Sequence, residues 1–347
     1  MLQDRYYFTH FFHAENRRFE EKNVQKEKTF HSAKQFLILE RQKEKEAMSP
    51  QVAVMIPCYN EAAAIAAVVE KARRVLPQAK IYVYDNNSTD GSADIARKAG
   101  AIVRHVPQQG KGAVVRRMFA DIDADVYVMT DGDMTYDLDK MPVLIDTLVS
   151  QQKDMVVGTR KEKQQEAYRF GHRFGNALLT FLVRVLFGIR QTDMLSGLRV
   201  FSKRFVKTFS ARSNGFEIET ELNIFTCVNK LPFAEVETDY FARPEGSASK
   251  LSTVKDGFKI LFMISRLFRI EKPLPFYFLL ALCAAAAVLF DGVFIDSEES
   301  PLMFYGFIGF WFFLFCGIVL NGQLKNKRES VRLAYLSYPF ANNDDNS

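Results

Sequence analysis

The sequence has 347 residues, 48% hydrophobic and 25% charged, which is enough for one full α/β domain and an additional segment. Its net charge of +5 is mild, and no block of lysine and arginine is interleaved with stacking aromatics, which argues against nucleic-acid binding. The four cysteines form neither a CxxC pair nor a metal-binding spacing, so we interpret them as packing residues in a reducing cytoplasm. The 32 phenylalanines crowd into the last two-fifths of the chain, which indicates a membrane-facing part.

Residues 1–47 form a charged extension that is rich in lysine, glutamate, arginine and glutamine and contains no glycine or proline. Long side chains with opposite charges three or four positions apart favour a solvated helix. A poorly ordered extension is the alternative, and both remain open. We expect the folded domain to begin at Met48, just before the first strand.

Strands and helices alternate through the first half of the predicted domain, residues 48–252. The expected strands are 52–56, 80–84, 101–106 and 126–129, with Pro57 ending the first. The expected helices are 62–75, 92–99 and a stretch from about 112 to 121. This alternation predicts βαβ units and therefore an α/β fold with a largely parallel sheet.

The strand 126–129 stops abruptly at Asp131, Gly132 and Asp133. In an open α/β sheet, ligands bind outside the carboxyl ends of the strands. Carboxylates at this spacing suit Mg²⁺ or Mn²⁺, which use one or two protein carboxylates and substrate phosphate oxygens. A polar exit that merely ends the strand is the alternative.

Two more polar positions follow neighbouring elements of the same expected sheet. Asp85 ends the second strand, where it could accept hydrogen bonds from a base or ribose, although a loop-capping Asx turn would explain it equally. Lys111 lies between two glycines at a helix start, and helix N-termini bind anions such as a diphosphate. This is not a Walker loop, because the first glycine and the terminal Ser/Thr are missing.

In order and spacing, four segments together resemble family 2 glycosyltransferases, which are inverting enzymes with a GT-A nucleotide-sugar fold. They are Ile56–Glu61, Asp85–Gly91, Gly110–Gly112 and Asp131–Asp133. Four later segments are similar to the polyprenyl-phosphate branch, whose members are dolichyl-phosphate mannose synthase-like: Gly158–Arg160, Asp193–Arg199, Glu217–Glu219 and Arg243–Leu251. The resemblance covers residues 50–270.

The resemblance implies three groups of site residues. The nucleotide-sugar site is expected at Pro57, Tyr59, Glu61, Asp85, Lys111 and Asp131. The metal, Mg²⁺ or Mn²⁺, is expected mainly on Asp133 with help from Asp131. The acceptor phosphate is expected on a basic cluster of Arg160, Arg173, Ser196, Arg199, Arg243 and Lys250. We expect Asp131, Asp133, Arg160 and Arg199 to carry catalysis, and Lys250 to lie on a lid loop.

Two positions depart from the family pattern, and a third residue has a structural alternative to its expected role. Thr135 stands where relatives often have a metal-binding glutamine, so Asp137 or water would replace that contact. Asn86 stands where many relatives have aspartate, which leaves Asp85 as the carboxylate expected to read the base or ribose. For Arg199, a salt bridge to Asp193 or Glu217 is the structural alternative to phosphate binding.

Two amphipathic stretches suggest contact with a membrane surface. In the segment 165–188, apolar residues recur at helical spacing, and the stretch 253–272 repeats the pattern: Phe174, Leu178, Phe181 and Val185, then Phe258, Leu261, Phe262, Ser265 and Phe268. Interfacial helices would place these faces at the acyl boundary. A core-facing stripe is the alternative.

Two uncharged spans follow, Leu274–Phe290 and Leu302–Leu320, each close to the length that crosses a bilayer. Basic residues precede the first span and follow the second. The positive-inside rule therefore predicts a hairpin over 273–323, with the catalytic domain, the tail 324–347 and both termini in the cytoplasm. A buried hairpin in a soluble protein is the alternative.

The resemblance and the spans together predict an integral membrane enzyme. We expect inverting transfer of a hexose from a UDP- or GDP-sugar to a membrane polyprenyl phosphate. Two other interpretations remain: the same fold acting on another acceptor, such as diacylglycerol or a polysaccharide, and a non-catalytic membrane scaffold. The identities of the sugar and nucleotide, and whether the protein is a homo-oligomer, are not determined by the sequence.

Overall fold

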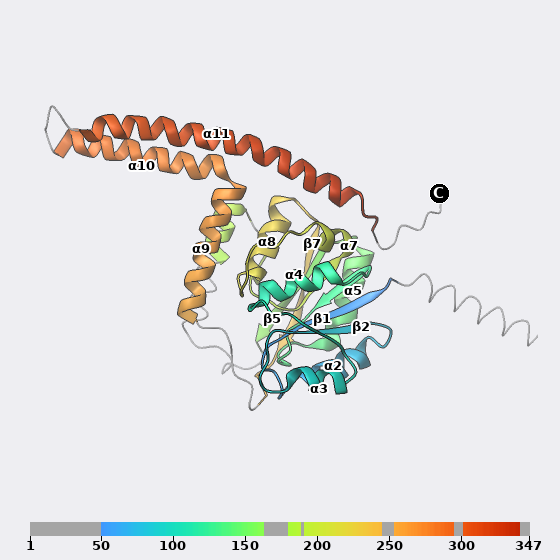
Figure 1. The fold of residues 1–347 in the computed structure, drawn as a ribbon. Coiled ribbons are helices and arrows are strands. Elements are labelled where there is room, and N and C mark those ends of the chain that lie inside the picture. Colours follow the sequence, from blue (N-terminus) through green and yellow to red (C-terminus); the bar gives the residue numbers. More distant parts are fainter. Residues whose placement is uncertain (1–49, 163–179, 189–190, 245–252, 295–300, 341–347) are drawn as a thin grey trace, which may run out of the picture. The chain divides into compact units, whose positions relative to one another are not determined.

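A computed structural model describes residues 50–162, 180–188, 191–244, 253–294 and 301–340 (Figure 1). The extension 1–47, most of the segment 165–188, Arg173 and Lys250 lie outside these residues.

The centre of the domain is one seven-stranded sheet in the order β3-β2-β1-β4-β6-β5-β7 (Figure 1). Its strands are β1 Val52–Cys58, β2 Lys80–Asp85, β3 Ile102–His105, β4 Val126–Met129, β5 Met155–Glu162, β6 Arg199–Ser202 and β7 Phe233–Tyr240. Neighbours pair in parallel except at β6, which runs antiparallel to both β4 and β5. The predicted α/β fold with a mostly parallel sheet is therefore confirmed.

The strand and helix boundaries in the first half of the domain agree closely with the expected ones. The helices there and in the second half are α2 Ile65–Val75, α3 Ser92–Lys98, α4 Lys111–Asp121, the short 3₁₀ helix η1 Leu138–Lys140, α5 Met141–Ser150, α7 Lys203–Thr208 and α8 Ile218–Val228. Only the expected strand end at Pro57 is wrong. Beyond Met55, β1 pairs with β2 but no longer with β4, so a residue without an N–H is tolerated there.

Helices cover both faces of the sheet, because alternate residues of a strand point to opposite sides. In β1, Val54 and Ile56 pack in one core cluster with α2 and α5. Ala53 and Met55 pack in a second cluster with α4 and α8. Burial on both faces explains why β1 and β4 read as continuous apolar runs.

The amphipathic helix α9, Thr253–Glu271, packs one face on the domain and exposes the other. Its buried residues Ile260, Met263, Ile264 and Leu267 form a third core cluster with α8 and the helical segment 180–187. On the opposite face, Phe258 and Phe262 are 69% and 73% exposed. In the segment 180–187, Phe181 and Val185 are also exposed, so the part of the predicted stripe that the structure describes faces outward.

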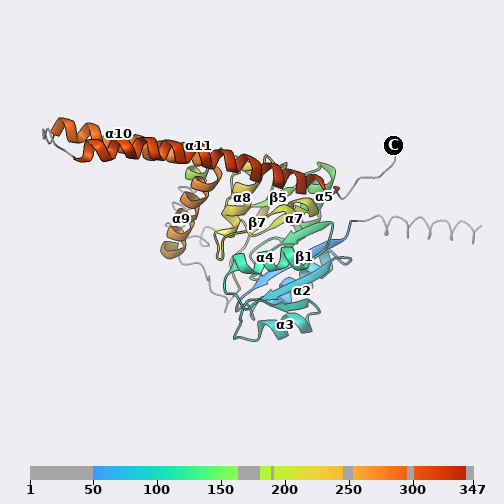
Figure 2. The ribbon, with the colours of Figure 1, turned by 45° about the horizontal axis from the view of Figure 1, so that its top comes forward.

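The last two helices are α10, Pro273–Phe294, and α11, Pro301–Leu336, and they lie side by side in both views (Figures 1 and 2). Glycine makes the close approach possible, since a Cβ at Gly306 would clash with Val288. By length and composition, Pro273–Asp291 and Phe304–Leu336 are both apolar enough to cross a membrane, and few of their residues are buried within the protein. They form the pair of helices that the sequence predicts.

Helix α11 continues past the span expected from the sequence, and its polar end contacts the catalytic domain. Lys327 forms an ion pair of 2.9 Å with Glu271 at the end of α9. Further along, the Tyr335 hydroxyl donates a hydrogen bond of 2.7 Å to the buried Asp154 carboxylate. The Arg204 guanidinium lies over the rings of Tyr335 and Phe340, 4.6 and 4.8 Å from their centroids. Much of the predicted tail is therefore a helix docked on the domain.

We expect Tyr335→Phe to loosen this docked end. Loss of one hydrogen bond to a carboxylate costs about 1.5 kcal/mol, which increases the open population roughly tenfold. Limited trypsin digestion should then cut after Arg328 or Arg332 about tenfold faster. Tyr82→Phe is the matched control, because that hydroxyl makes no hydrogen bond within the described chain; equal cleavage of the two variants would contradict the docking role.

Candidate active site

A cavity of about 510 Å³ opens at the carboxyl ends of β1, β2 and β4, the edge where an open α/β sheet binds its ligands. The lining includes most of the residues expected at the nucleotide-sugar and metal sites. These are Pro57, Tyr59, Glu61, Lys111, Asp131 and Asp133. These six residues, which the sequence analysis expected at one site, therefore line the same cavity in the structure.

Asp133 is almost fully buried, and both of its oxygens have partners. Its Oδ1 accepts hydrogen bonds from the Thr135 hydroxyl at 2.6 Å and the Thr135 amide at 3.1 Å. Its Oδ2 forms an ion pair of 2.6 Å with Arg243, a residue expected at the acceptor phosphate. Thr135 thus orients the Asp133 carboxylate.

Lys111 bridges two carboxylates beside this pair. Its ammonium group lies 2.5 Å from Asp131 and 2.6 Å from Glu219. Burial works against the charge on Lys111, but the two carboxylates outweigh it and raise its pKa. Burial in turn raises the pKa of Glu219, an effect that the Lys111 charge opposes. At the same helix start, the Gly112 amide donates to the Asn214 carbonyl at 2.9 Å, so this N–H is already satisfied by the protein.

The donor set at the end of β4 fits a divalent cation of the Mg²⁺ or Mn²⁺ type. Within the described residues, no group of three or more His, Cys, Asp or Glu side chains could hold a metal. Asp131 and Asp133 would hold the ion, and in the structure each forms an ion pair, with Lys111 and Arg243 respectively. This matches ions that take one or two carboxylates and complete their shell with substrate phosphates and water.

Asp85 is buried beside the cavity and keeps one oxygen unsatisfied. Its Oδ2 accepts from the Ser88 amide at 3.3 Å and lies 3.5 Å from His105 Nδ1. Its Oδ1 is buried without a hydrogen-bond partner in the described structure. A buried acceptor of this kind is costly unless a donor satisfies it, so the position suits a ligand N–H or O–H.

Asn86 has a clear role that the sequence interpretation missed. Its amide nitrogen donates to the carbonyls of Val106 and Gln108, both at 2.8 Å. Its amide oxygen accepts from the Gly110 amide at 2.7 Å. An aspartate could not donate, so the asparagine at this position fixes the loop that leads to Lys111.

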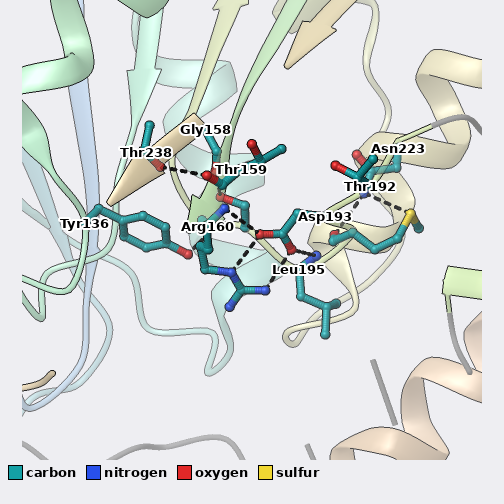
Figure 3. Close-up of polar contacts among 12 residues, drawn as sticks. Tyr136, Gly158, Thr159, Arg160, Thr192, Asp193, Leu195, Asn223 and Thr238 are labelled. Carbon is teal, nitrogen blue, oxygen red and sulfur yellow. Dashed lines mark hydrogen bonds and ion pairs between the residues drawn. The ribbon is translucent and has the colours of Figure 1, made fainter. Parts of the chain in front are cut away.

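Arg160 lies in a separate polar cluster (Figure 3). Its guanidinium donates two hydrogen bonds of 2.7 Å to Asp193, and its amide donates a third, of 3.2 Å, to the same carboxylate. Burial works against the charge on Asp193, but the Arg160 hydrogen bonds outweigh it and lower the pKa of Asp193. Asp193, one of the two salt-bridge partners considered for Arg199, therefore pairs with Arg160 instead.

Arg199 and Ser196 are fully buried, and their hydrogen bonds within the described structure go to neighbouring protein groups. Arg199 donates to the carbonyls of Ser196 at 2.8 Å and Met194 at 3.1 Å, and to the Asn223 side chain at 2.6 Å. Ser196 donates its hydroxyl to the Gly158 carbonyl at 2.5 Å. These contacts support the turn before β6; direct phosphate binding by either residue stays a prediction.

Apart from Glu217, one wall of the cavity consists of residues that the sequence analysis did not name. The loop 213–217 forms one wall, with Asn214, Gly215, Phe216 and Glu217, and Lys259 reaches the lining from α9. The Glu221 carboxylate fixes the loop by accepting hydrogen bonds from the amides of Arg212 and Ser213 and from the Ser213 hydroxyl. In the sequence, the Glu217–Glu219 segment was the signal that pointed to this wall.

The mostly parallel sheet, with a pair of aspartates at the end of β4, is that of the GT-A fold class. The model for glycosyl transferase family 2 matches residues 53–209. Protein RfbJ of Shigella flexneri is 56% identical over 123 residues, which cover 35% of this chain and 95% of that protein. Glycosyltransferase AglJ of Haloferax volcanii is 34% identical over 229 residues, which cover 65% of this chain and 75% of that protein.

The chain therefore belongs to glycosyl transferase family 2. The dolichyl-phosphate hexose transferase of H. volcanii is 30% identical over 206 residues, covering 59% of this chain and 89% of that one. Among solved structures, glucosyl-3-phosphoglycerate synthase of M. tuberculosis shares the fold with a TM-score of 0.51 and 22% identity, covering 65% of this chain and 84% of that one.

Gly197 should tolerate no side chain, because a Cβ there would clash with the Asp131 carboxylate. We expect Gly197→Ala to displace Asp131 from Lys111 and to destabilise the fold by about 1–3 kcal/mol, as overpacking does. Thermal unfolding in detergent measures this. Gly322→Ala, at a helical glycine with open space around it, is the control and should not lower the midpoint, because alanine favours a helix more than glycine does. An unchanged midpoint for Gly197→Ala would refute the close approach.

Proposed function

We propose that this glycosyltransferase moves a hexose, with inversion, from a UDP- or GDP-sugar to a membrane polyprenyl phosphate. Two relatives carry names of this kind: the dolichyl-phosphate hexose transferase and, at 27% identity over 238 residues, the UDP-N-acetylglucosamine–dolichyl-phosphate N-acetylglucosaminyltransferase of Methanococcus voltae. One observation carries the proposal. On the single helix α9, Lys259 lines the cavity, while Phe258 and Phe262 are exposed. The same helix is followed directly by the two apolar helices.

The donor would lie along the strand ends. Pro57, Tyr59 and Glu61 form the nucleotide rim, and the unsatisfied Asp85 oxygen accepts a hydrogen bond from the base or ribose. A fold neighbour, glucosyl-3-phosphoglycerate synthase, was solved with Mn²⁺ and UDP-glucose, with a TM-score of 0.51. This likeness supports a nucleoside diphosphate as the donor's leaving group.

Asp133 and Asp131 would hold the metal. Bound Mg²⁺ or Mn²⁺ supplies charge neutralisation for the leaving diphosphate. Lys111 and Arg243 balance the two carboxylates in the structure. When donor and acceptor are bound, we propose that these two cationic side chains turn to phosphate oxygens, so that the site keeps its charge balance.

The acceptor phosphate oxygen is already anionic and needs little general-base help. Positioning and charge stabilisation then account for most of the rate enhancement. We propose Arg243 and Lys259 as its direct ligands in the described part of the cavity, together with the predicted Arg173 and Lys250. Arg160, Ser196 and Arg199 would contribute mainly by shaping the neighbouring loops.

We further propose that α10 and α11 cross the membrane with the catalytic domain and both termini in the cytoplasm. The basic residues at the inner ends, Arg269, Lys272, Lys325, Lys327 and Arg328, agree with the positive-inside rule. The exposed face of α9 would lie at the acyl boundary, close to the lipid acceptor.

The deciding experiment incubates detergent-purified protein with polyprenyl phosphate and labelled UDP- and GDP-sugars, with Mn²⁺ or Mg²⁺ and with a chelator. We expect an organic-extractable product from one donor that chelation abolishes. Product formed only on diacylglycerol or on a glycan would replace the acceptor assignment. Absence of any metal-dependent transfer would favour the scaffold interpretation.

Asp133→Asn should lower turnover roughly 100-fold or more, the order found when one charge-stabilising group is lost. The same assay, with thermal unfolding as a folding check, measures this. Asp146→Asn, at an exposed position on α5, is the control and should keep full activity. A folded Asp133→Asn enzyme with substantial metal-dependent turnover would remove the metal assignment.

Lys259→Ala should raise the KM for polyprenyl phosphate about tenfold, because a charge-assisted hydrogen bond of about 1.4 kcal/mol is lost. The KM for the donor should change little. Arg266→Ala, an exposed cation further along α9 that does not line the cavity, is the matched control. Equal changes in both KM values, or equal effects of the two variants, would argue against a role for Lys259 at the acceptor.

A further inference from the structure

Glu217 differs from the other acidic residues around the cavity. Asp131 and Glu219 share Lys111, and Asp133 pairs with Arg243. The Glu217 side chain also lines the cavity and is partly buried, yet the described residues give its carboxylate no hydrogen bond or ion pair. A cavity carboxylate that no described residue binds is available to a ligand.

The position of Glu217 leaves its side chain unused by the fold. It is the N-cap residue of α8, but its side chain makes no capping hydrogen bond. The carboxylate instead lies over Gly215, where a Cβ would clash with Glu217 Oε2. The missing side chain at Gly215 therefore gives the carboxylate its place at the cavity wall.

The wall that carries Glu217 is fixed from two sides. Glu221 binds the backbone of Arg212 and Ser213 from within the domain. The Asn214 carbonyl accepts hydrogen bonds from the amides of Gly112 and Ala113 at the start of α4. Side chains on such a pre-organised wall discriminate between ligands better than side chains on a loose loop.

The chemistry of this wall matches a neutral, hydroxyl-rich group. A further carboxylate in the cavity that Asp131 and Asp133 also line repels the donor diphosphate, but it accepts hydrogen bonds from sugar hydroxyls strongly. The adjacent Phe216 also lines the cavity and offers an apolar surface for the carbon face of a sugar ring. We infer that Glu217 binds hydroxyl groups of the donor hexose and helps to determine which sugar is transferred.

This inference rests on the proposed nucleotide-sugar donor but not on the lipid acceptor, so its test measures binding. Calorimetry with Mn²⁺ compares UDP-glucose with UDP and GDP-mannose with GDP. For the pair in which the sugar improves wild-type affinity, Glu217→Ala should weaken nucleotide-sugar binding about tenfold and leave nucleotide binding unchanged. Glu217→Gln, which keeps the shape, should show a smaller loss, and Glu70→Ala on the exposed side of α2 should show none.

Deoxygenated donors identify the contact. Removing the hydroxyl that Glu217 binds should weaken wild-type binding about tenfold, and the same analogue should bind Glu217→Ala no worse than the parent donor. Equal losses for nucleotide and nucleotide sugar, or no loss in a folded Glu217→Ala protein, would overturn the assignment. If wild-type protein binds a donor but forms no lipid product, only the proposed lipid acceptor is refuted. If wild-type protein binds none of these ligands, the proposed nucleotide-sugar donor and the assignment of Glu217 are both overturned.

Discussion

Carboxylate groups gather at a buried strand end only where cations balance them, since an unpaired buried charge is strongly destabilising. At the end of β4, the Lys111 ammonium group forms ion pairs with Asp131 and Glu219, and the Arg243 guanidinium forms one with Asp133. The rest of the cavity depends on this balance. Asn86 fixes the loop before Lys111, Gly197 leaves room for Asp131, and the 213–217 wall is bound to the start of α4.

The same arrangement links the site to the C-terminal helices. Arg243 follows β7 and Lys259 lies on α9, so cationic lining comes from the part of the chain that leads to the apolar pair. The polar end of α11 returns to the domain at Asp154 through Tyr335 and Arg204. The domain is therefore held at both α9 and the end of α11, which restricts how it can move relative to α10 and α11.

Prediction from sequence worked best where local rules decide the outcome. Apolar runs buried on both faces marked β1 and β4, and polar residues after strand ends marked Asp131 and Asp133, because parallel strands bring those ends to one edge. It worked less well where pairing between distant residues decides. Asp193 lies six positions from Arg199 in the sequence but 33 positions from Arg160, with which it forms its ion pair. Sequence distance therefore favours the wrong partner, and the course of the chain before β6 decides the right one. The 213–217 wall likewise depends on contacts with residues about a hundred positions away.

The sequence by itself determined the α/β class, the family resemblance, the strand-end aspartates and the two apolar spans, because periodicity, length and motif spacing are local properties. The tertiary structure decided the partners: Arg243 pairs with Asp133, Arg199 lies in the interior, and the helical end of α11 contacts Asp154. It also left the Glu217 carboxylate without a hydrogen bond or ion pair among the described residues. Side chains of the same charge and type differ in role only through burial and neighbours. Those are set by packing between elements far apart in the chain.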